Sequence, residues 1–181
     1  MSELASKTAV PSPSLPAEDF KALFRGHLGG VGLITADAGD GPVALTATSV
    51  ASISVDTPLR VFSVSEQSSA AEVLTKASTL VVHSLDVRGI EVAKLGTTSG
   101  IDRFAQAPTW TRLAAGEPVF DGVRAWVRCE VCERVQAGTS TVFVDRALQS
   151  HIECDSEPGQ PSDGLVYHNR TLHRLCGHLR L

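Results

Sequence analysis

Along most of the chain from Val31 onward, apolar residues alternate with polar ones or form short apolar runs. This period of two is typical of β-strands, and turn residues such as those at 37–42 and 56–58 separate one strand from the next. The segment Thr79–Leu85 has apolar residues at successive positions, which indicates a strand buried on both faces. Strands are therefore predicted over residues 31–36, 43–48, 51–55, 59–65 and 79–85.

The second half of the chain contains a longer alternating run, 123–135, with valines on one face and arginines on the other. The turn Gln136–Thr139 leads into a partner strand, 141–148, and a final hairpin breaks at Asn169. A strand of this length usually bends or spans the side of a barrel. The pattern predicts a mainly β, closed or nearly closed antiparallel barrel with a few short helices.

Three helices are predicted between the strands. The first follows Pro16, with acids in its first turn and apolar residues on one face, and ends at Gly29-Gly30. The others cover about 69–76 and, from a cap at Asp86, the segment ending near Gly96. Residues 1–16 are rich in Ser, Pro and Ala and are expected to be a flexible arm, so that 17–181 form a single domain.

Composition narrows the functional classes. The chain has 181 residues and a net charge of −4, without the basic surface of a nucleic-acid binder. No apolar stretch is long enough to cross a bilayer, and residues 1–16 do not resemble a secretory signal, so a cytoplasmic location with reduced thiols is expected. Cys129 and Cys132 have CxxC spacing but would lie on opposite faces of a strand, so no metal site is expected.

Hydroxyl side chains are concentrated in three neighbouring segments, Thr46–Ser54, Phe62–Ser65 and Gln67–Ser69. Hydroxyls and free backbone N–H groups near a helix start suit an anion, and small side chains let backbone amides approach a flat heterocycle. The alternative is that Ser and Thr are simply common in strands and at helix caps.

The order of several motifs resembles the flavin reductase-like proteins, whose fold is an FMN-binding split barrel. Ala44-Leu-Thr-Ala-Thr-Ser49 with Ser52 and Pro58-Leu59 resembles the family's hydroxyl-rich first motif. Asp102-Arg-Phe104 resembles its Asp-Arg-Phe segment, and Glu117–Trp126 its entry to the long strand. Tyr167–Leu175 resembles its closing hairpin. The match covers about Phe20 to Leu175.

The resemblance implies an antiparallel split β-barrel of Greek-key type, a homodimer, and a flavin near each subunit interface. The catalytic candidate is His168, either as a proton donor or only as a hydrogen-bonded core residue. The residues that would face the nicotinamide are Ser140, Tyr167 and Arg170. The residues that would bind the flavin are Thr46, Ala47, Thr48, Ser49, Ser52, Ser63, Val64, Ser65, Ser68, Ser69, Arg103 and Phe104.

The chain departs from the family pattern at several positions. Ala70 replaces a Thr in the phosphate segment, Ser140 a His beside the nicotinamide, Asp145 a Gly and Gly96 an aromatic residue. These changes affect oxidation of a nicotinamide more than they affect flavin binding.

The resemblance implies an NAD(P)H-dependent flavin reductase: a nicotinamide delivers hydride to bound FMN or FAD, and the reduced flavin supplies a monooxygenase. The alternatives are a non-catalytic flavin carrier on the same fold and an interaction domain with a vestigial pocket. His83, inside a buried strand, is expected to be a hydrogen-bonded core residue. The sequence leaves open NADH or NADPH, with four arginines available for a 2′-phosphate, Arg60, Arg88, Arg112 and Arg124.

Overall fold

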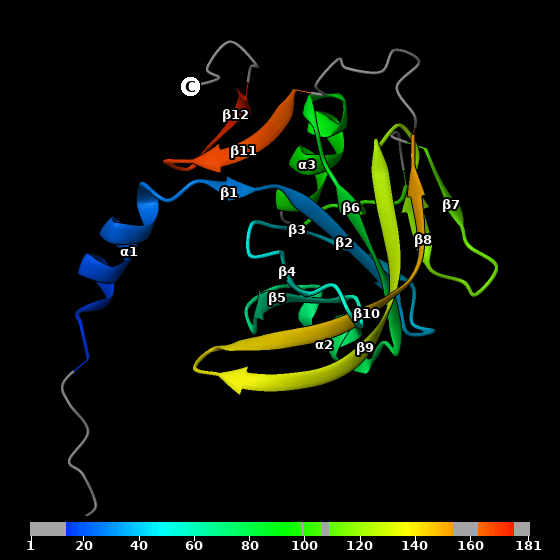
Figure 1. Ribbon diagram of the computed structural model, residues 1–181, viewed down its shortest axis with the longest axis horizontal. Helices are drawn as coiled ribbons and strands as arrows, with labels where there is room; N and C mark the ends of the chain where they lie inside the picture. Colours follow the sequence, from blue (N-terminus) through cyan, green and yellow to red (C-terminus); the bar gives the residue numbers. More distant parts are fainter. Residues whose placement is uncertain (1–13, 99, 106–108, 154–162, 176–181) are drawn as a thin grey trace, which may run out of the picture.

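Most of the strands belong to one antiparallel sheet in the computed structural model, which describes residues 14–98, 100–105, 109–153 and 163–175. Its seven strands run in the order β3-β2-β6-β9-β10-β5-β4 (Figure 1). Their bounds are β2 Gly32–Asp37, β3 Pro42–Ala47, β4 Ala51–Ser54, β5 Leu59–Ser65, β6 Thr79–Ser84, β9 Ala125–Ala137 and β10 Ser140–Ile152. The predicted mainly β, antiparallel architecture is confirmed.

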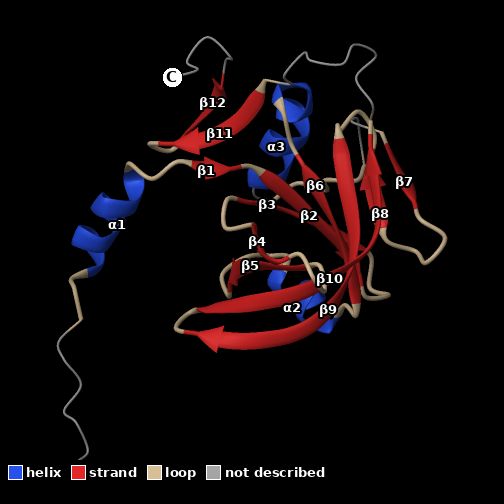
Figure 2. Ribbon diagram, viewed as in Figure 1, coloured by secondary structure: helices blue, strands red, loops and turns tan. Residues whose placement is uncertain are grey.

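The two long strands, β9 and β10, connect the two halves of this sheet. The first part of β9, as far as Glu130, pairs with β6, whereas the first part of β10, Ser140 to Arg146, pairs with β5. Two register shifts interrupt the β9–β10 pairing, one of them between Val144 and Asp145. Because such irregularities bend and twist a strand pair, the sheet curves strongly along these strands (Figure 2). Strands β3 and β4 form its two edges.

Two small sheets complete the β structure. Strands β1 (Gly29–Gly30), β11 (Gly164–His168) and β12 (Thr171–Leu175) form one, with β11 in the middle. Its β11–β12 turn holds Asn169 and Arg170 at φ angles of 47° and 64°. The other sheet is the hairpin of β7 (Trp110–Arg112) and β8 (Pro118–Phe120). The sequence pattern did not predict this hairpin, because three-residue strands are too short to show a period.

Helices lie at the predicted places. Helix α2 (Ala71–Lys76) precedes β6, and the short helix η1 (Val87–Gly89) leads into α3 (Ile90–Thr97). The predicted cap is present, since the Asp86 carboxylate accepts a hydrogen bond from the backbone N–H of Arg88 at 2.9 Å. Helix α1 (Ala17–Arg25) buries none of its residues and lies outside the main sheet (Figure 1). None of the helices in the described part of the chain has the length and apolarity to span a bilayer.

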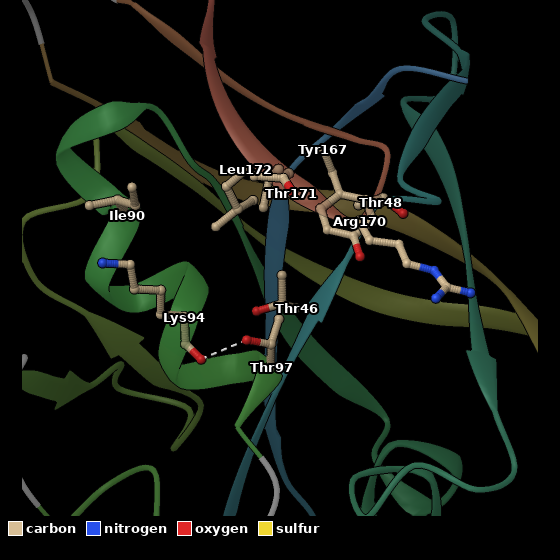
Figure 3. A pocket seen from close by; sticks show the side chains of 10 residues that line it. Thr46, Thr48, Ile90, Lys94, Thr97, Tyr167, Arg170, Thr171 and Leu172 are labelled. Carbon is tan, nitrogen blue, oxygen red and sulfur yellow. Dashed lines mark hydrogen bonds between the residues drawn. The ribbon is translucent and has the colours of Figure 1, made fainter. Parts of the chain in front are cut away.

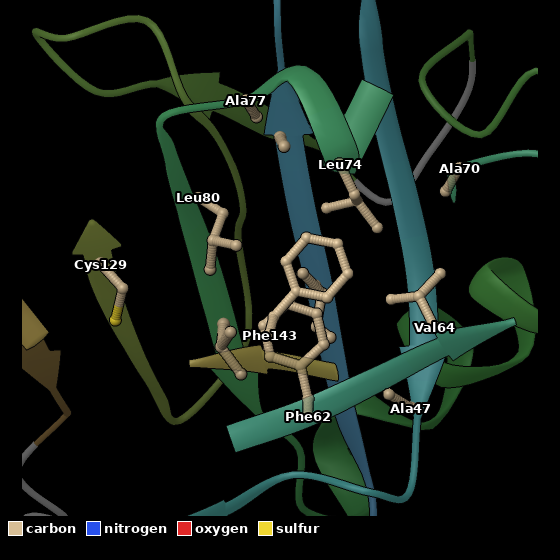
Figure 4. Close-up of a cluster of buried hydrophobic side chains, with 12 residues drawn as sticks. Ala47, Phe62, Val64, Ala70, Leu74, Ala77, Leu80, Cys129 and Phe143 are labelled. Carbon is tan, nitrogen blue, oxygen red and sulfur yellow. The ribbon is translucent and has the colours of Figure 1, made fainter. Parts of the chain in front are cut away.

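Buried side chains form two clusters. One lies between the curved sheet and α2, where the rings of Phe62 and Phe143 stack with their centroids 4.9 Å apart (Figure 4). The other lies beneath α3 and includes Leu33, Phe120 and Leu165. His83 is fully buried: its Nδ1 lies 3.0 Å from the Leu33 carbonyl oxygen and its Nε2 accepts the Phe120 N–H at 3.1 Å. The expectation of a hydrogen-bonded core histidine is confirmed, and burial lowers the pKa of His83 to about 4.

The expectation of a flexible arm over 1–16 and a single domain over 17–181 remains a prediction. Residues 1–13 lie outside the described residues, as do Cys154 and Cys176. Cys129 is buried and Cys132 is exposed, so the two thiols of the CxxC sequence lie in different environments.

Candidate functional site

A wide cavity opens where β3, α3 and the β11–β12 hairpin meet (Figure 3). Its volume is about 640 Å³. Four of the residues selected from the sequence line it, although they come from opposite ends of the chain: Thr46, Thr48, Tyr167 and Arg170. Apolar side chains of Val31, Ile90 and Leu172 form the rest of the wall with Lys94, Thr97 and Thr171.

A close approach of α3 to β3 shapes this cavity. The Thr46 hydroxyl donates a hydrogen bond to the Ala93 carbonyl oxygen at 2.8 Å. A Cβ atom added at Gly96 would lie 2.1 Å from Thr46 Oγ1 and 2.8 Å from the Thr46 backbone nitrogen. Only glycine therefore fits at the position where the family pattern has an aromatic residue, and the helix lies directly against the strand.

A second cavity, of about 290 Å³, lies farther along β3. Ser69, Arg103 and Phe104 line it together with the first residues of β3, Pro42 to Ala44. The Arg103 guanidinium donates to the Leu95 and Thr98 carbonyl oxygens at 3.2 and 2.8 Å, and its Nη1 lies 3.5 Å from Ser69 Oγ. Arg103 therefore stabilises the C-terminal end of α3 and also presents its charge beside a hydroxyl. Strand β3 forms a wall of both cavities.

The remaining serines lie around the ends of β3 and β5 and on β4. Ser49 Oγ accepts the Ser63 N–H at 3.0 Å and lies 3.3 Å from the Ser63 carbonyl oxygen, which ties the end of β3 to β5. Ser65 and Ser68 each accept a backbone N–H two residues later, in the loop before α2. Ser52 lies on the edge strand β4, opposite Arg60.

Two of the predicted flavin-binding residues point into the protein interior. The side chains of Ala47 and Val64 belong to the main buried cluster, with 7% and 2% of their surface exposed. The side chains of Ala47 and Val64 are therefore not available to a ligand. Phe104 also packs inward, with its ring centroid 5.0 Å from that of Trp110 and 5.2 Å from that of Phe120.

The structure does not bring the nicotinamide-side candidate Ser140 or the catalytic candidate His168 to the first cavity. Ser140 begins β10 and pairs with Ser65, so it lies with the flavin-side serines, whereas Tyr167 lies on a separate sheet (Figure 1). His168 follows Tyr167 in β11, and neighbouring residues of a strand point to opposite faces. The His168 ring lies 5.8 Å from that of His173, and neither histidine lines the cavity. His168 therefore lies outside the cavity, next to His173.

Sequence reasoning did not select the contributions of α3 and β12 to the cavity. Thr97 donates its hydroxyl to the Lys94 carbonyl oxygen at 2.8 Å, and the Lys94 ammonium is hydrogen-bonded to Glu91 at 2.8 Å. The signal was present for α3, because Ile90 and Lys94 are four residues apart and share a flank of the helix. Nothing in the sequence showed that Leu172 of β12 closes the opposite side.

Comparison with known proteins identifies the class to which this fold and this site belong. The family model described as the flavin reductase like domain matches residues 24–175. The chain belongs to this family, as the motifs in its sequence indicated. An NADH:FMN oxidoreductase of Rhodococcus erythropolis is 35% identical over 163 residues, which are 90% of this chain and 84% of that protein.

Two further relatives extend the comparison. The FMN reductase (NADH) RutF of Variovorax paradoxus is 29% identical over 96% of this chain and 95% of its own length. Among solved structures, BorF, the flavin reductase component of a bacterial two-component tryptophan halogenase, is 28% identical. It superposes with a TM-score of 0.76 over 88% of this chain and 98% of its own.

Proposed function

We propose that this protein is a flavin reductase that uses NADH or NADPH to reduce FMN. The observation that carries the proposal is the pair of cavities along β3, one wide and hydroxyl-lined and one with Arg103 beside Ser69, in a chain of the flavin reductase-like family. The activities named for the Rhodococcus and Variovorax relatives support FMN and NADH as the pair of substrates. FAD and NADPH are the variants to be tested.

The residues present fit a flavin. An isoalloxazine ring is flat, with two apolar faces and a polar edge, and the wide cavity combines apolar Val31, Ile90 and Leu172 with hydroxyls of Thr46 and Thr48. Strand β3 is an edge of the sheet, so part of its backbone is not paired with another strand. The serines at 49, 52, 63, 65 and 68 would bind the ribityl chain.

The second cavity fits a phosphate. The Arg103 guanidinium offers forked donors at 3.5 Å from the Ser69 hydroxyl, and both groups face the same space. The carbonyl oxygens of Leu95 in α3 and of Thr98 just after it hold the guanidinium in place, so it loses little conformational entropy when an anion binds.

When bound, FMN supplies the redox chemistry by accepting a hydride from the nicotinamide. The chain's own contribution is binding and orientation, since a hydride transfer depends on alignment of the two rings. Tyr167 and Arg170 hold the nicotinamide at the mouth of the wide cavity. The apolar side chain of Leu172 excludes water from the wall of that cavity. Because this step needs no protein acid or base, the position of His168 outside the cavity is compatible with catalysis.

The finer architecture and the assembly also belong to this proposal. The curved sheet has its two edges at β3 and β4, as expected of a split barrel of Greek-key type. The exposed apolar side chains of α1, among them Leu23 with 69% of its surface exposed, favour a homodimer. BorF and the reductase component of an Acinetobacter trigonelline monooxygenase support a partner oxygenase that receives the reduced flavin. The free thiols Cys129 and Cys132 agree with a cytoplasmic location.

The test combines turnover with ligand selectivity. NADH and NADPH oxidation at 340 nm is measured with FMN, FAD or no added flavin, and a flavin-dependent rate is expected. The variant Arg103→Gln should weaken FMN binding about tenfold and leave riboflavin, which lacks the phosphate, unaffected. Arg146→Gln, which removes an exposed arginine on β10, is the control. Flavin binding without turnover would favour the carrier alternative, and no flavin binding at all would refute the proposal.

A further inference from the structure

The wide cavity has a positively charged lining. Among the described residues that line it are two cations, Lys94 and Arg170, and no carboxylate. Arg170 lies at the nicotinamide end of the proposed site and also lines a cavity of about 270 Å³ against α1. A second copy in the proposed homodimer covers the apolar face of α1. The rim that stays open to the rest of a dinucleotide is therefore the one formed by α3.

Hydrogen bonds hold this part of α3 in position. The hydroxyls of Thr97 and Thr98 both donate to the Lys94 carbonyl oxygen, at 2.8 and 3.0 Å. The preceding carbonyl, that of Ala93, accepts the Thr46 hydroxyl at 2.8 Å. Figure 3 shows Lys94 on α3, across the cavity from the β11–β12 hairpin. A ligand that extends over this rim therefore meets side chains that project from an anchored backbone.

The charge of Lys94 at this rim is compensated by Glu91, which lies one turn earlier in α3. The Glu91 carboxylate lies 2.8 Å from the Lys94 ammonium, and the two side chains are 70% and 58% exposed. Both groups are therefore accessible to a ligand. The rim offers a carboxylate next to a cation whose charge is already paired.

None of the four arginines that the sequence offered for a 2′-phosphate lines the wide cavity. Three of them are each paired with a carboxylate: Arg60, Arg88 and Arg112. These three and Arg124 are absent from the lining of the cavity. Lys94 is thus the cation that the α3 rim offers to a phosphate, and Glu91 already neutralises it.

We infer that Glu91 selects NADH over NADPH, because its carboxylate accepts a hydrogen bond from the 2′-hydroxyl of the adenosine ribose and repels the 2′-phosphate of NADPH. This inference rests on the proposed function and names the dinucleotide that the same site takes. A carboxylate only accepts hydrogen bonds, so it suits a ribose hydroxyl, as acidic residues do in other dinucleotide-binding proteins. It opposes a phosphate, whose charge is about −1.5 to −2. Without Glu91, the ammonium of Lys94 would attract that phosphate instead.

The first measurement is the ratio of kcat/KM for NADH to kcat/KM for NADPH, with FMN as acceptor. The wild type is expected to favour NADH about tenfold, and Glu91→Gln to lower this ratio about five- to tenfold, because one charge–charge contact at an exposed site changes from repulsive to attractive. Adding Lys94→Gln should remove the gain with NADPH. The matched control is Glu72→Gln, which removes a glutamate that is paired with Lys76 on α2 and does not line the wide cavity.

Three results would overturn the inference: a wild type that favours NADPH, an unchanged ratio in Glu91→Gln, or a gain with NADPH that survives Lys94→Gln. A ratio that falls equally in Glu72→Gln would also overturn it, because the effect would then come from the loss of any helical ion pair.

The second measurement uses binding alone, so that the inference and the proposed function can fail separately. The FMN-loaded protein is titrated calorimetrically with NAD⁺ and NADP⁺, and Glu91→Gln should bind NADP⁺ about fivefold more tightly than the wild type. If this shift occurs but the chain oxidises neither NADH nor NADPH, the proposed function is wrong and the inference stands. Turnover with the same NAD⁺ to NADP⁺ affinity ratio in both chains refutes the inference alone. A chain that binds neither dinucleotide refutes both.

Discussion

Replacing Gly96 with alanine tests the close approach of α3 to β3. The new methyl group would lie 2.1 Å from Thr46 Oγ1, 2.6 Å from Leu33 Cδ1 and 2.8 Å from the Thr46 backbone nitrogen. A hydroxyl can rotate away, but a backbone nitrogen inside a paired strand moves only with the strand. The substitution should therefore separate α3 from β3 and break the hydrogen bond from Thr46 to Ala93.

Two opposing effects determine how much stability the Gly96→Ala substitution costs. Alanine is favoured over glycine inside a helix by about 1 kcal/mol. Overpacking by one carbon costs about 1–3 kcal/mol, and loss of the Thr46 hydrogen bond adds about 1 kcal/mol. The net expectation is a loss of about 2 kcal/mol in the free energy of unfolding, or about 4–8 °C in Tm for a chain of this size. FMN affinity should fall as well, because Thr46 lines the wide cavity.

Urea unfolding of the wild type, Gly96→Ala and Gly30→Ala measures this effect. Gly30 is the matched control, since a Cβ atom there would meet no atom within 4 Å. In a double-mutant cycle, Thr46→Ala should cost less stability in the Gly96→Ala background than in the wild type. If Gly96→Ala equals or exceeds the wild type in stability, helix propensity dominates and the reasoning about this contact is refuted.

Three further predictions concern other parts of the molecule. Arg60→Met should destabilise the protein by about 3–5 kcal/mol, because it leaves the fully buried Asp145 carboxylate without its ion pair. Adding Asp145→Leu to the same chain should restore most of the lost stability, as measured by urea unfolding. The free energy of unfolding should fall by up to about 3 kcal/mol from pH 6.5 to pH 4, because His83 is protonated near pH 6.5 in the unfolded chain but only at its pKa of about 4 in the folded one. A His83→Gln variant whose stability depends on pH in the same way would contradict this. Ser69→Asp should weaken FMN binding more than riboflavin binding in fluorescence titrations, and equal losses would exclude a phosphate at this position.

The regular strands and helices of the fold were predictable because their alternation of apolar and polar residues is visible within a few neighbouring positions. Strand β5 has the predicted bounds, and the cap at Asp86 is present. Strand β10 extends past the predicted Leu148 to Ile152, because pairing with β9 supports its exposed end after the alternation weakens. Whether the apolar face of α1 is exposed depends on whether another part of the chain packs against it, and the periodicity of the sequence does not show this.

The site was predictable in its residues but not in their grouping. Thr46 and Tyr167 are far apart in sequence, and the pairing of β1 with β11, together with a bridge between Asp86 and Gly164, brings the closing hairpin beside the sheet. Alternation could have indicated at the outset that the side chains of Tyr167 and His168 point to opposite faces of β11. The inward direction of the Ala47 and Val64 side chains follows from the curvature of the sheet, and a motif match gives no information about that direction.

The surroundings of Cys129 affect how well the enzyme withstands oxidation that follows from its own product, reduced flavin. Reduced flavin that leaves a protein reacts with dissolved oxygen and forms hydrogen peroxide, which attacks thiolates. Burial raises the pKa of the Cys129 thiol to about 12, so only about one molecule in 10⁵ carries the thiolate at pH 7. Cys132 lies exposed three residues away. Peroxide should therefore oxidise Cys132 first, while the buried Cys129 thiol stays protonated and the packing of β9 is unchanged.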